Sequence, residues 1–451
     1  MPRWPCSASG VVTTDTSVDK GRGAGLTGVE VAHGGKLIIP MTHRSSTTEV
    51  LLARQPILNG DLTAVGYELL YRSAASDHAD VRDDELATAR VSLSAMTEME
   101  LERLVDQRRA WINVTREFVL GGLARTIPPE RVVLELLEDQ VVDQALLDAV
   151  SQLRTGGYLV ALDDFTLTAD VEPLLPRIDI VKLDLQALGA EGLTRLAHEL
   201  SPHRLTLVAE KLEDHADFEV ALAAGCDLFQ GYFFCRPELI EGTAVAPSKL
   251  AVLKLAADVQ DPAVDLAALD RVISTDVALS YRLLRYINSA YFSLRQPIST
   301  VMQAVALLGV DNVRSWTTMM ILAQIGGKPR ELFVTALVRA RFCQLAAHPD
   351  HGTGSELFAL GLFSVIDALT DRPMVEVVQT LPFPDAMRDA LVNRSGSGRL
   401  LDAVAAMEAG EFTRAQRLVR GAAEHYLGAV AWTNETAKHM LNGDRAATAR
   451  T

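Results

Sequence analysis

The stretch Leu159-Val160-Ala161-Leu162-Asp163-Asp164 decides how the first half of this chain folds. It is an apolar run of strand length that ends on two adjacent carboxylates. Just before it, Gly156-Gly157 marks the end of a helix and a turn. Two aspartates side by side repel each other unless a cation offsets their charge. The stretch therefore predicts a buried strand that follows a helix and whose carboxyl end is suited to a metal ion.

Similar apolar runs recur on both sides of this stretch, and each ends on a polar residue suited to binding metal or activating water. The end residues are Asn113, Glu135, Asp163 with Asp164, Lys182, Glu210 and Gln230, and Glu68 precedes the series. From Asn113 to Gln230 the intervals are 22, 28, 19, 28 and 20 positions, about one strand plus one helix each. This alternation predicts a TIM-like (β/α) barrel of parallel strands, which gathers strand-end residues on one face.

The length of 451 residues suggests two domains, and the composition changes along the chain. We expect a disordered N-terminal extension at 1–47, a barrel domain at 48–241, a linker at 242–247, an all-α domain at 248–440 and a flexible tail at 441–451. The extension is rich in Gly, Ser and Thr without sustained periodicity. Met41 stands just before the first patterned segment, so the true start is either Met1 or Met41. The fold class is α/β plus all-α.

Helical spacing supports this division. Helices are expected at Asp83 to Val105, Gln140 to Leu153 and Ala187 to Leu200. Beyond 248 the strand alternation disappears, and apolar residues recur at helical spacing. There Thr300 is expected to cap a helix that Gly309 ends, and Phe358 to Leu369 predicts a buried helix. Trp316 and Met319-Met320 are expected in the core.

Composition excludes several classes of function. The net charge of −15 disfavours non-specific nucleic-acid binding, which depends on clustered Lys and Arg. The four cysteines are scattered, which favours reduced thiols over a zinc site. No apolar run is long enough to span a bilayer, and the N-terminus has no apolar signal segment. We expect a cytoplasmic protein that does not act at a membrane.

The chemistry of the strand-end residues points to phosphate transfer. Carboxylate and amide oxygens suit Mg²⁺ or Mn²⁺, and two such ions can clamp both oxygens of a phosphodiester displacement. Lys182 and Gln230 are suited to orient or deprotonate a water, and Glu210 to hold a metal or the lysine. Alternatively, each acid only caps the next helix, and Lys182 only pairs with an acid inside the barrel.

Several motifs in the first half resemble, in type and order, those of the EAL domain family of cyclic di-GMP phosphodiesterases. They are Glu68-Leu69-Leu70-Tyr71-Arg72, Asn113, Leu134-Glu135-Leu136-Leu137-Glu138, Asp163-Asp164-Phe165, Lys182-Leu183-Asp184, Ala209-Glu210 and Gln230-Gly231-Tyr232. The resemblance implies a first metal ion bound by Glu68, Asn113, Glu135 and Asp163, and a second bound by Asp163 and Asp164. It implies that Lys182, with Glu210 and Gln230, acts on the nucleophilic water. Arg72 and Leu70 would contact the ligand.

The chain departs from the family pattern around this site. Leu69 replaces an alanine, and Lys211 replaces the glycine after Glu210. Residues 166–170 contain no glycine where the family has a glycine-containing loop, although Glu213 matches the glutamate that anchors that loop. Losing glycines removes left-handed backbone conformations, and a metal site loosened by about 1 Å loses much of its rate. These departures favour nucleotide binding over catalysis.

The second half resembles the HDOD domain, a helical module without the metal-binding His-Asp pair of related hydrolases. The resemblance covers roughly 248–440 and is strongest from 270 to 325. It rests on Asp276 to Leu284, Asn288 to Phe292, Ile298-Ser299 and Ala304 to Gly309. Asn288 is expected to be structural. His348, Asp350 and His351 predict a solvated loop, with a metal site as the weaker alternative.

Together these resemblances predict a signal transduction protein that senses cyclic di-GMP or serves as a scaffold through its HDOD domain. The alternative is an active Mg²⁺- or Mn²⁺-dependent phosphodiesterase that linearises cyclic di-GMP. A protein partner for the HDOD domain is expected, and a homodimer is an open alternative to a monomer. A nucleic-acid regulator is the weakest hypothesis, because the chain is acidic.

Overall fold

The computed structural model describes most of the chain between residues 50 and 440. The described residues are 50–73, 98–137, 140–165, 168, 171–238, 247–260, 266–275, 279–280, 283–284, 287–288, 298–322, 325, 327–348 and 352–440. The predicted extension, the predicted tail and all of the predicted linker except Pro247 lie outside them. So do Asp350, His351 and the part of the predicted helix before Glu98. The described residues belong to one compact unit, 48–451.

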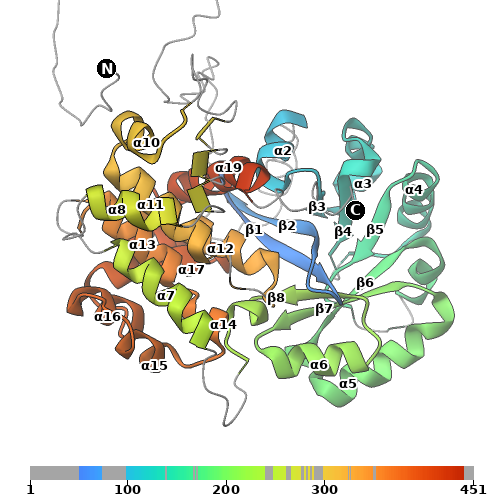
Figure 1. Cartoon of the computed structure of the whole chain (residues 1–451). Coiled ribbons are helices and arrows are strands. Elements are labelled where there is room, and N and C mark those ends of the chain that lie inside the picture. Colours follow the sequence, from blue (N-terminus) through green and yellow to red (C-terminus); the bar gives the residue numbers. More distant parts are fainter. Residues whose placement is uncertain are drawn as a thin grey trace, which may run out of the picture. The chain divides into compact units, whose positions relative to one another are not determined.

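Eight strands close into a barrel in sequence order, as the sequence predicted. They are β1 (Val50–Asn59), β2 (Ala64–Ser73), β3 (Arg109–Val114), β4 (Val132–Leu136), β5 (Leu159–Leu162), β6 (Ile180–Asp184), β7 (Thr206–Leu212) and β8 (Leu228–Gly231). Figure 1 shows them in blue to green, with α3 (Arg116–Leu120), α4 (Gln144–Thr155), α5 (Leu185–Leu200) and α6 (His215–Ala223) outside the strands. The barrel therefore has the TIM-like arrangement of an inner sheet and outer helices.

The expectation of a barrel made only of parallel strands is wrong for β1. This strand runs antiparallel to both neighbours, with Ile57 opposite Gly66 of β2 and Gln230 of β8. The turn after it explains the direction, because the Asn59 side chain accepts hydrogen bonds from the backbone of Asp61 and Thr63 at 3.1 and 2.9 Å. So short a connection can only form a hairpin, whereas parallel strands need a long crossover.

Aspartate caps begin the barrel helices close to the predicted positions. Asp143 accepts a hydrogen bond from the Leu146 backbone at the start of α4, and Asp184 does the same for α5. The predicted helices at 140–153 and 187–200 are thus confirmed with shifts of a few residues. Gly157 has a φ of +89° just after α4, which confirms the predicted helix end. The described residues between β5 and β6 include a 3-10 helix, η3 (Glu172–Arg177), and no α-helix.

The described part of the second half contains helices and no strands, as predicted. They are α7 (Pro247–Gln260), α8 (Leu266–Thr275), α10 (Val301–Leu308), α11 (Val310–Leu322), α12 (Arg330–Leu345), α13 (Gly354–Phe363), α14 (Ile366–Thr370), α15 (Met374–Gln379), α16 (Asp385–Val392), α17 (Arg399–Glu408), α18 (Phe412–Leu418) and α19 (Ala422–Met440). Figure 1 shows these in yellow-green to red. No helix among the described residues is both long and apolar enough to cross a membrane.

Most local predictions for the second half are confirmed. Thr300 and Gln303 form a capping box at the start of α10, and Gly309 follows its end with a φ of +85°. Trp316, Met319 and Met320 are buried in the core. Asn288 pairs through its amide with the backbone N–H and carbonyl of Ile298, both at 2.7 Å, so its role is structural. Phe358 to Leu369 is buried and largely helical as predicted, but a turn at Ser364 and Val365 divides it between α13 and α14 instead of the single helix expected.

Buried tyrosines link the outer face of the barrel to the helical half. The Tyr67 hydroxyl donates to the Glu331 carboxylate of α12 at 3.0 and 3.1 Å. Tyr426 of α19 donates to the Arg54 carbonyl of β1 at 3.3 Å. Both side chains are almost fully buried, so the two halves share a continuous core at β1 and β2 rather than a hydrated boundary.

Candidate active site

The site residues lie in the layer of inward-facing side chains nearest the carboxyl ends of the parallel strands. Below them, an apolar cluster inside the barrel takes one residue from each of six strands: Ile57, Trp111, Val133, Ala161, Ile180 and Val208. Because successive side chains of a strand alternate between faces, the next inward-facing position is two residues further on. From Trp111, Val133, Ala161, Ile180 and Val208, that step reaches Asn113, Glu135, Asp163, Lys182 and Glu210. The strand alternation therefore positions the site on a packed floor.

β2 fits this layer only because it carries a glycine. Gly66 lies two positions before Glu68, where the other strands carry an apolar side chain. A Cβ at Gly66 would lie 2.4 Å from the indole nitrogen of Trp111. The Trp111 side chain of β3 thus fills the space that a side chain at Gly66 of β2 would otherwise occupy. The backbone of β2 can therefore lie close to β3, with Glu68 facing the centre of the site.

Lys182 is the centre of the site. Its ammonium lies 2.5 Å from Glu210, 2.8 Å from Asp163, 3.1 Å from Glu135 and 3.3 Å from Glu68, measured to the nearest carboxylate oxygen. The Lys182 side chain is 1% exposed, which excludes water as its main partner. Four carboxyl groups, three on strands and one directly after β5, thus converge on one cation.

Glu68 is held by amide donors on both sides. Asn113 donates to one of its oxygens at 3.1 Å, and Gln230 donates to the other at 2.6 Å. Gln230 also donates to the side-chain oxygen of Gln55 at 2.9 Å. The structure therefore brings six of the predicted site residues together with Lys182, which leaves Asp164 as the predicted strand-end residue outside this cluster.

Burial and the excess of acids shift the pKa values of these groups. Burial raises the pKa of Glu210 to about 8, because the pull of Lys182 does not offset it. Burial and the Glu68 charge hold the pKa of Glu135 well above its ordinary value. Burial also raises the pKa of Glu68, yet Lys182 and the Gln230 hydrogen bond outweigh it, and the net shift is downward. Burial lowers the pKa of Lys182, but Glu135 and Glu68 reverse this and keep it charged.

Several oxygens of this cluster lack a hydrogen-bond donor. The buried atoms without one include Asn113 Oδ1, both Glu135 oxygens, Asp163 Oδ1 and Gln230 Oε1. Of these atoms, Asp163 Oδ1 and one Glu135 oxygen contact the Lys182 ammonium, at 2.8 and 3.1 Å. Buried acceptors without donors are costly, and hard oxygens around excess negative charge suit Mg²⁺ or Mn²⁺. The donor set therefore fits a divalent cation by its chemistry.

The geometry around Lys182 is nonetheless not that of a preformed metal cage. Among the described residues, no three His, Cys, Asp or Glu side chains are placed to hold a metal ion together. The reason is visible in the distances, because the ammonium itself lies where the carboxylates converge. A cation could enter only if these carboxylates turned partly away from Lys182.

Asp164 faces a different lysine. Its carboxylate lies 3.2 Å from the ammonium of Lys211, which also lies 2.5 Å from Asp184. Burial raises the pKa of Asp184, but the Lys211 hydrogen bond outweighs it and the net shift is downward. The sequence predicted Asp164 as a metal ligand and did not foresee this pairing. In the sequence, Lys211 stands out only as the replacement for a glycine.

The ligand contacts predicted at the end of β2 are not tested by the structure. Arg72 lies opposite Leu51 in the β1–β2 ladder, and its side chain is outside the described part of the structure. Leu70 is partly buried and lies against Gly410, where an added Cβ would come within 3.2 Å of it. Both stay predictions. Glu213 is largely exposed and lies 3.7 Å from Arg236, while residues 166, 167, 169 and 170 are outside the described residues.

Two contributors to the site were missed by the sequence reasoning. Gln55 lies directly opposite Glu68 in the β1–β2 ladder, which explains why it reaches Gln230. The Tyr71 hydroxyl donates to the backbone carbonyl of Asn113 and fixes that strand end. The hairpin register would have revealed Gln55, because residues opposite each other in antiparallel strands share a face.

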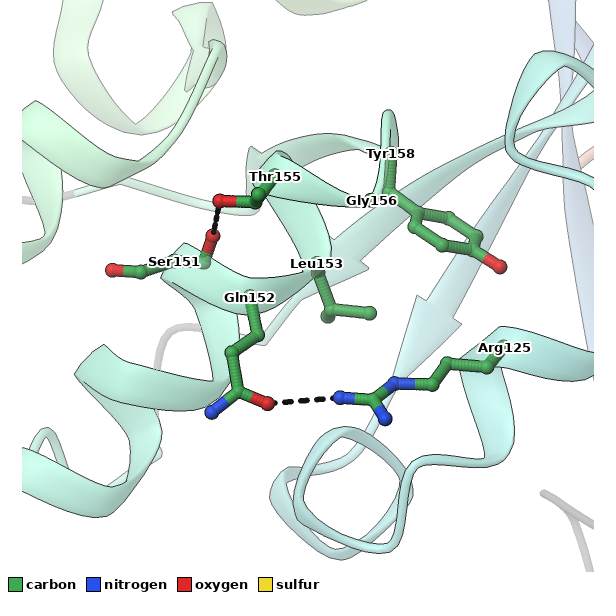
Figure 2. A pocket seen from close by; sticks show the side chains of 7 residues that line it. All are labelled: Arg125, Ser151, Gln152, Leu153, Thr155, Gly156 and Tyr158. Carbon is green, nitrogen blue, oxygen red and sulfur yellow. Dashed lines mark hydrogen bonds between the residues drawn. The ribbon is translucent and has the colours of Figure 1, made fainter.

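A surface pocket of about 610 Å³ lies elsewhere on the barrel (Figure 2). Its rim includes Arg125, which donates to Gln152 of α4 at 2.8 Å, and Tyr158. Tyr158 directly precedes β5, whereas Asp163 directly follows it. The pocket therefore lies at the opposite end of β5 from the cluster around Lys182 and does not belong to that site.

The fold and the site define an α/β-barrel protein with an acidic, lysine-centred site, joined to an all-α domain. The sequence matches the EAL domain family over residues 42–237 and the HDOD domain family over residues 247–366. The chain belongs to the family of proteins that join an EAL domain to an HDOD domain. Both resemblances inferred from the motifs are thereby confirmed.

Two relatives span most of this chain. It is 35% identical to the cyclic di-GMP phosphodiesterase CdgJ of Vibrio cholerae over 358 residues, which cover 78% of this chain and 83% of CdgJ. It is 29% identical to YuxH of Bacillus subtilis, an uncharacterized protein, over 85% of this chain and 98% of YuxH. A solved structure of a standalone EAL protein from Vibrio cholerae O395, bound to cyclic di-GMP, is 23% identical. That match has a TM-score of 0.34 and covers 42% of this chain and 92% of that protein.

Proposed function

We propose that this chain is a signalling protein whose barrel binds cyclic di-GMP together with Mg²⁺ or Mn²⁺. The observation that carries the proposal is the convergence of Glu68, Glu135, Asp163 and Glu210 on Lys182 at the carboxyl ends of the strands. The relative CdgJ, named as a cyclic di-GMP phosphodiesterase, supports the choice of ligand. The HDOD domain would bind a protein partner in a way that depends on whether the barrel has cyclic di-GMP bound.

Each group in the cluster has a distinct task in this proposal. Glu68, Asn113, Glu135 and Asp163 would hold the cation through their oxygens. When bound, the cation supplies positive charge that binds phosphate oxygens and makes a nearby water more acidic. Gln230 keeps Glu68 in place, since it donates to that carboxylate at 2.6 Å. Glu210, at 2.5 Å from Lys182, orients the ammonium.

A second candidate function is hydrolysis of cyclic di-GMP to the linear dinucleotide. The retention of Lys182 with Glu210 favours it, because binding alone does not need a charged lysine oriented by a buried acid. In this role Lys182 would position a water for in-line attack on the phosphorus and, being held protonated by its neighbours, would contribute charge. Arg72 would contact a ligand phosphate in either function.

The direct test is calorimetric titration of the full chain with cyclic di-GMP in the presence of Mn²⁺ or Mg²⁺. Chromatography of the same samples would detect the linear product. We expect binding in both cases and little or no product. Steady production of the linear dinucleotide would establish hydrolysis as the function instead.

Glu135→Gln is the most informative variant for this test, because Glu135 is fully buried and its oxygens lack hydrogen-bond donors. It should weaken cation-dependent binding by roughly tenfold or more, since it removes one charged ligand. Glu376→Gln is the matched control, as that carboxylate is 55% exposed, lies 3.4 Å from Arg372 and belongs to the helical half. A folded protein that binds no cyclic di-GMP under any of these conditions would refute the proposal.

The remaining features of the proposal rest on sequence alone. A cytoplasmic location, a protein partner for the HDOD domain and a homodimer stay predictions. The metal-site alternative at His348, Asp350 and His351 also stays untested, because two of these residues lie outside the described part of the chain.

A further inference from the structure

Two lysines hold two adjacent aspartates at the end of β5. Asp163 faces inward to the ammonium of Lys182 at 2.8 Å. Asp164 faces outward to the ammonium of Lys211 at 3.2 Å. Lys182 is buried, whereas the Lys211 side chain is 51% exposed. Each aspartate is therefore paired with a separate cation, one inside the barrel and one at its rim.

The backbone is shaped to hold Lys211 in this place. The pairing of β7 with β8 shifts between Ala209 and Leu212, so Lys211 lies in an irregularity of the strand. Lys211 has a φ of +58° and Asp164 a φ of +40°. Residues other than glycine rarely adopt this left-handed backbone conformation, and those that do are usually held in it by their surroundings.

The strand irregularity is fixed from the neighbouring strand. Gly231 of β8 lies so close to Leu212 that an added Cβ would come within 2.1 Å of the Leu212 carbonyl oxygen. This contact holds the residue after Lys211. The Lys211 side chain is fixed at its other end by Asp184, which lies 2.5 Å away and also caps α5. Backbone and side chain together direct the ammonium at Asp164.

We propose that Lys211 acts as a built-in cation at the rim of the site, occupying Asp164 so that the barrel takes up one divalent cation with high affinity rather than two. This inference rests on the proposed function and deepens it. The inner carboxylates can take one ion once they turn partly away from Lys182, while the charge of Lys211 repels a second ion and withholds a ligand from it. The protein would then bind cyclic di-GMP without the second ion that rapid hydrolysis needs.

The ion pair between Lys211 and Asp164 is weakened by water, because both side chains are exposed, at 51% and 41%. An ion pair in contact with water contributes little, so Lys211 should weaken the second ion rather than exclude it at every concentration. Removal of the ammonium also removes its repulsion of an incoming ion. We expect Lys211→Met to tighten binding of the second Mn²⁺ by roughly tenfold or more.

The experiment counts Mn²⁺ ions bound per full chain, by equilibrium dialysis with electron paramagnetic resonance of free Mn²⁺. The wild type should bind one ion tightly, and Lys211→Met should bind two. Lys211→Arg is the matched control, because it keeps the positive charge, and it should bind one. Cyclic di-GMP hydrolysis, followed on the same samples, should rise in Lys211→Met. Should the Met variant not fold, Lys211→Gln makes the same change in charge.

The outcomes separate this inference from the proposed function. A wild type that binds cyclic di-GMP and two Mn²⁺ ions with equal affinity would overturn the role of Lys211 and leave the proposed function standing. An unchanged count in folded Lys211→Met and Lys211→Gln would do the same. A folded wild type that binds neither Mn²⁺ nor cyclic di-GMP would overturn both. One ion in the wild type and two in the uncharged variants supports the inference.

Discussion

Replacing Lys182 with Met would remove the cation shared by four carboxyl groups while keeping a side chain of similar length. All four acids lie within 3.3 Å of the ammonium, and the Lys182 side chain is 1% exposed. Removing one partner of a buried ion pair costs about 3–5 kcal/mol, because the other charge is left buried. Since four acids lose their shared partner, we expect the free energy of unfolding of the metal-free protein to fall by at least about 3 kcal/mol.

The assay is urea unfolding followed by tryptophan fluorescence, in EDTA and then with Mn²⁺. Lys249→Met is the matched control, because Lys249 is 30% exposed and lies 3.9 Å from Asp371. Its loss should change the free energy of unfolding by about 1 kcal/mol or less. Mn²⁺ should restore stability to Lys182→Met more than to the control, since a divalent cation would replace the missing charge.

The pH dependence of the variant gives a second test with a defined sign. The pKa of Glu210 is already raised to about 8, mainly by burial, and losing Lys182 can only raise it further. An acid whose folded pKa lies above its unfolded value binds more protons in the folded state, so its contribution to stability is lost as pH rises through that range. Glu210 of the folded wild type ionises at about pH 8, whereas in Lys182→Met it should stay protonated to a higher pH. Lys182→Met should therefore lose stability relative to the wild type as the pH rises above about 8. A loss below about 1 kcal/mol at pH 8 in EDTA would refute this account of the cluster.

Three further changes test other parts of the structure. Tyr67→Phe removes the donor to the buried Glu331 carboxylate and should destabilise the protein by about 1.5–3 kcal/mol in urea unfolding. If Tyr67→Phe costs as much in a protein that also carries Glu331→Leu as it does in the wild type, the hydrogen bond to Glu331 is not the cause. Gly231→Ala places a Cβ 2.1 Å from the Leu212 carbonyl oxygen at a φ of +146°, so the melting temperature of the protein should fall. An unchanged melting temperature would show that β7 can move away from β8 at no cost, against this reasoning. Burial raises the pKa of Cys343 to about 12, so mass spectrometry should find its thiol unlabelled by iodoacetamide at pH 8 in the native protein and labelled in urea.

The sequence predicted the strand-end residues because two signals coincide there. An apolar residue marks the barrel interior, and the polar residue two positions later faces the same way, as with Ala161 and Asp163 or Ile180 and Lys182. Strand alternation is a local property of the backbone, so it needs no tertiary information. The helix ends at Gly157 and Gly309 were also predictable from local sequence, because glycine readily adopts the positive φ that ends a helix, and both residues have one.

Other features depended on which residues meet across the fold. The sequence reasoning treated the barrel strands as parallel, but a short turn at Asn59 makes β1 antiparallel and brings Gln55 to Gln230. Lys211 and Asp164 lie 47 positions apart, and only the irregularity of β7 turns one toward the other. Neither composition nor spacing indicates a contact of that kind.

The sequence by itself determined the barrel, the helical second half and the identity of the residues at the strand ends, because periodicity and capping act over a few neighbouring positions. The tertiary structure alone decided the charge pairing: Lys182 lies among four carboxylates, and Lys211 takes Asp164. Such pairing depends on distances of a few ångströms between separate strands. The energy of an ion pair depends on the distance between its charges and on how deeply they are buried. Both quantities are set when the barrel closes, and local sequence does not specify them.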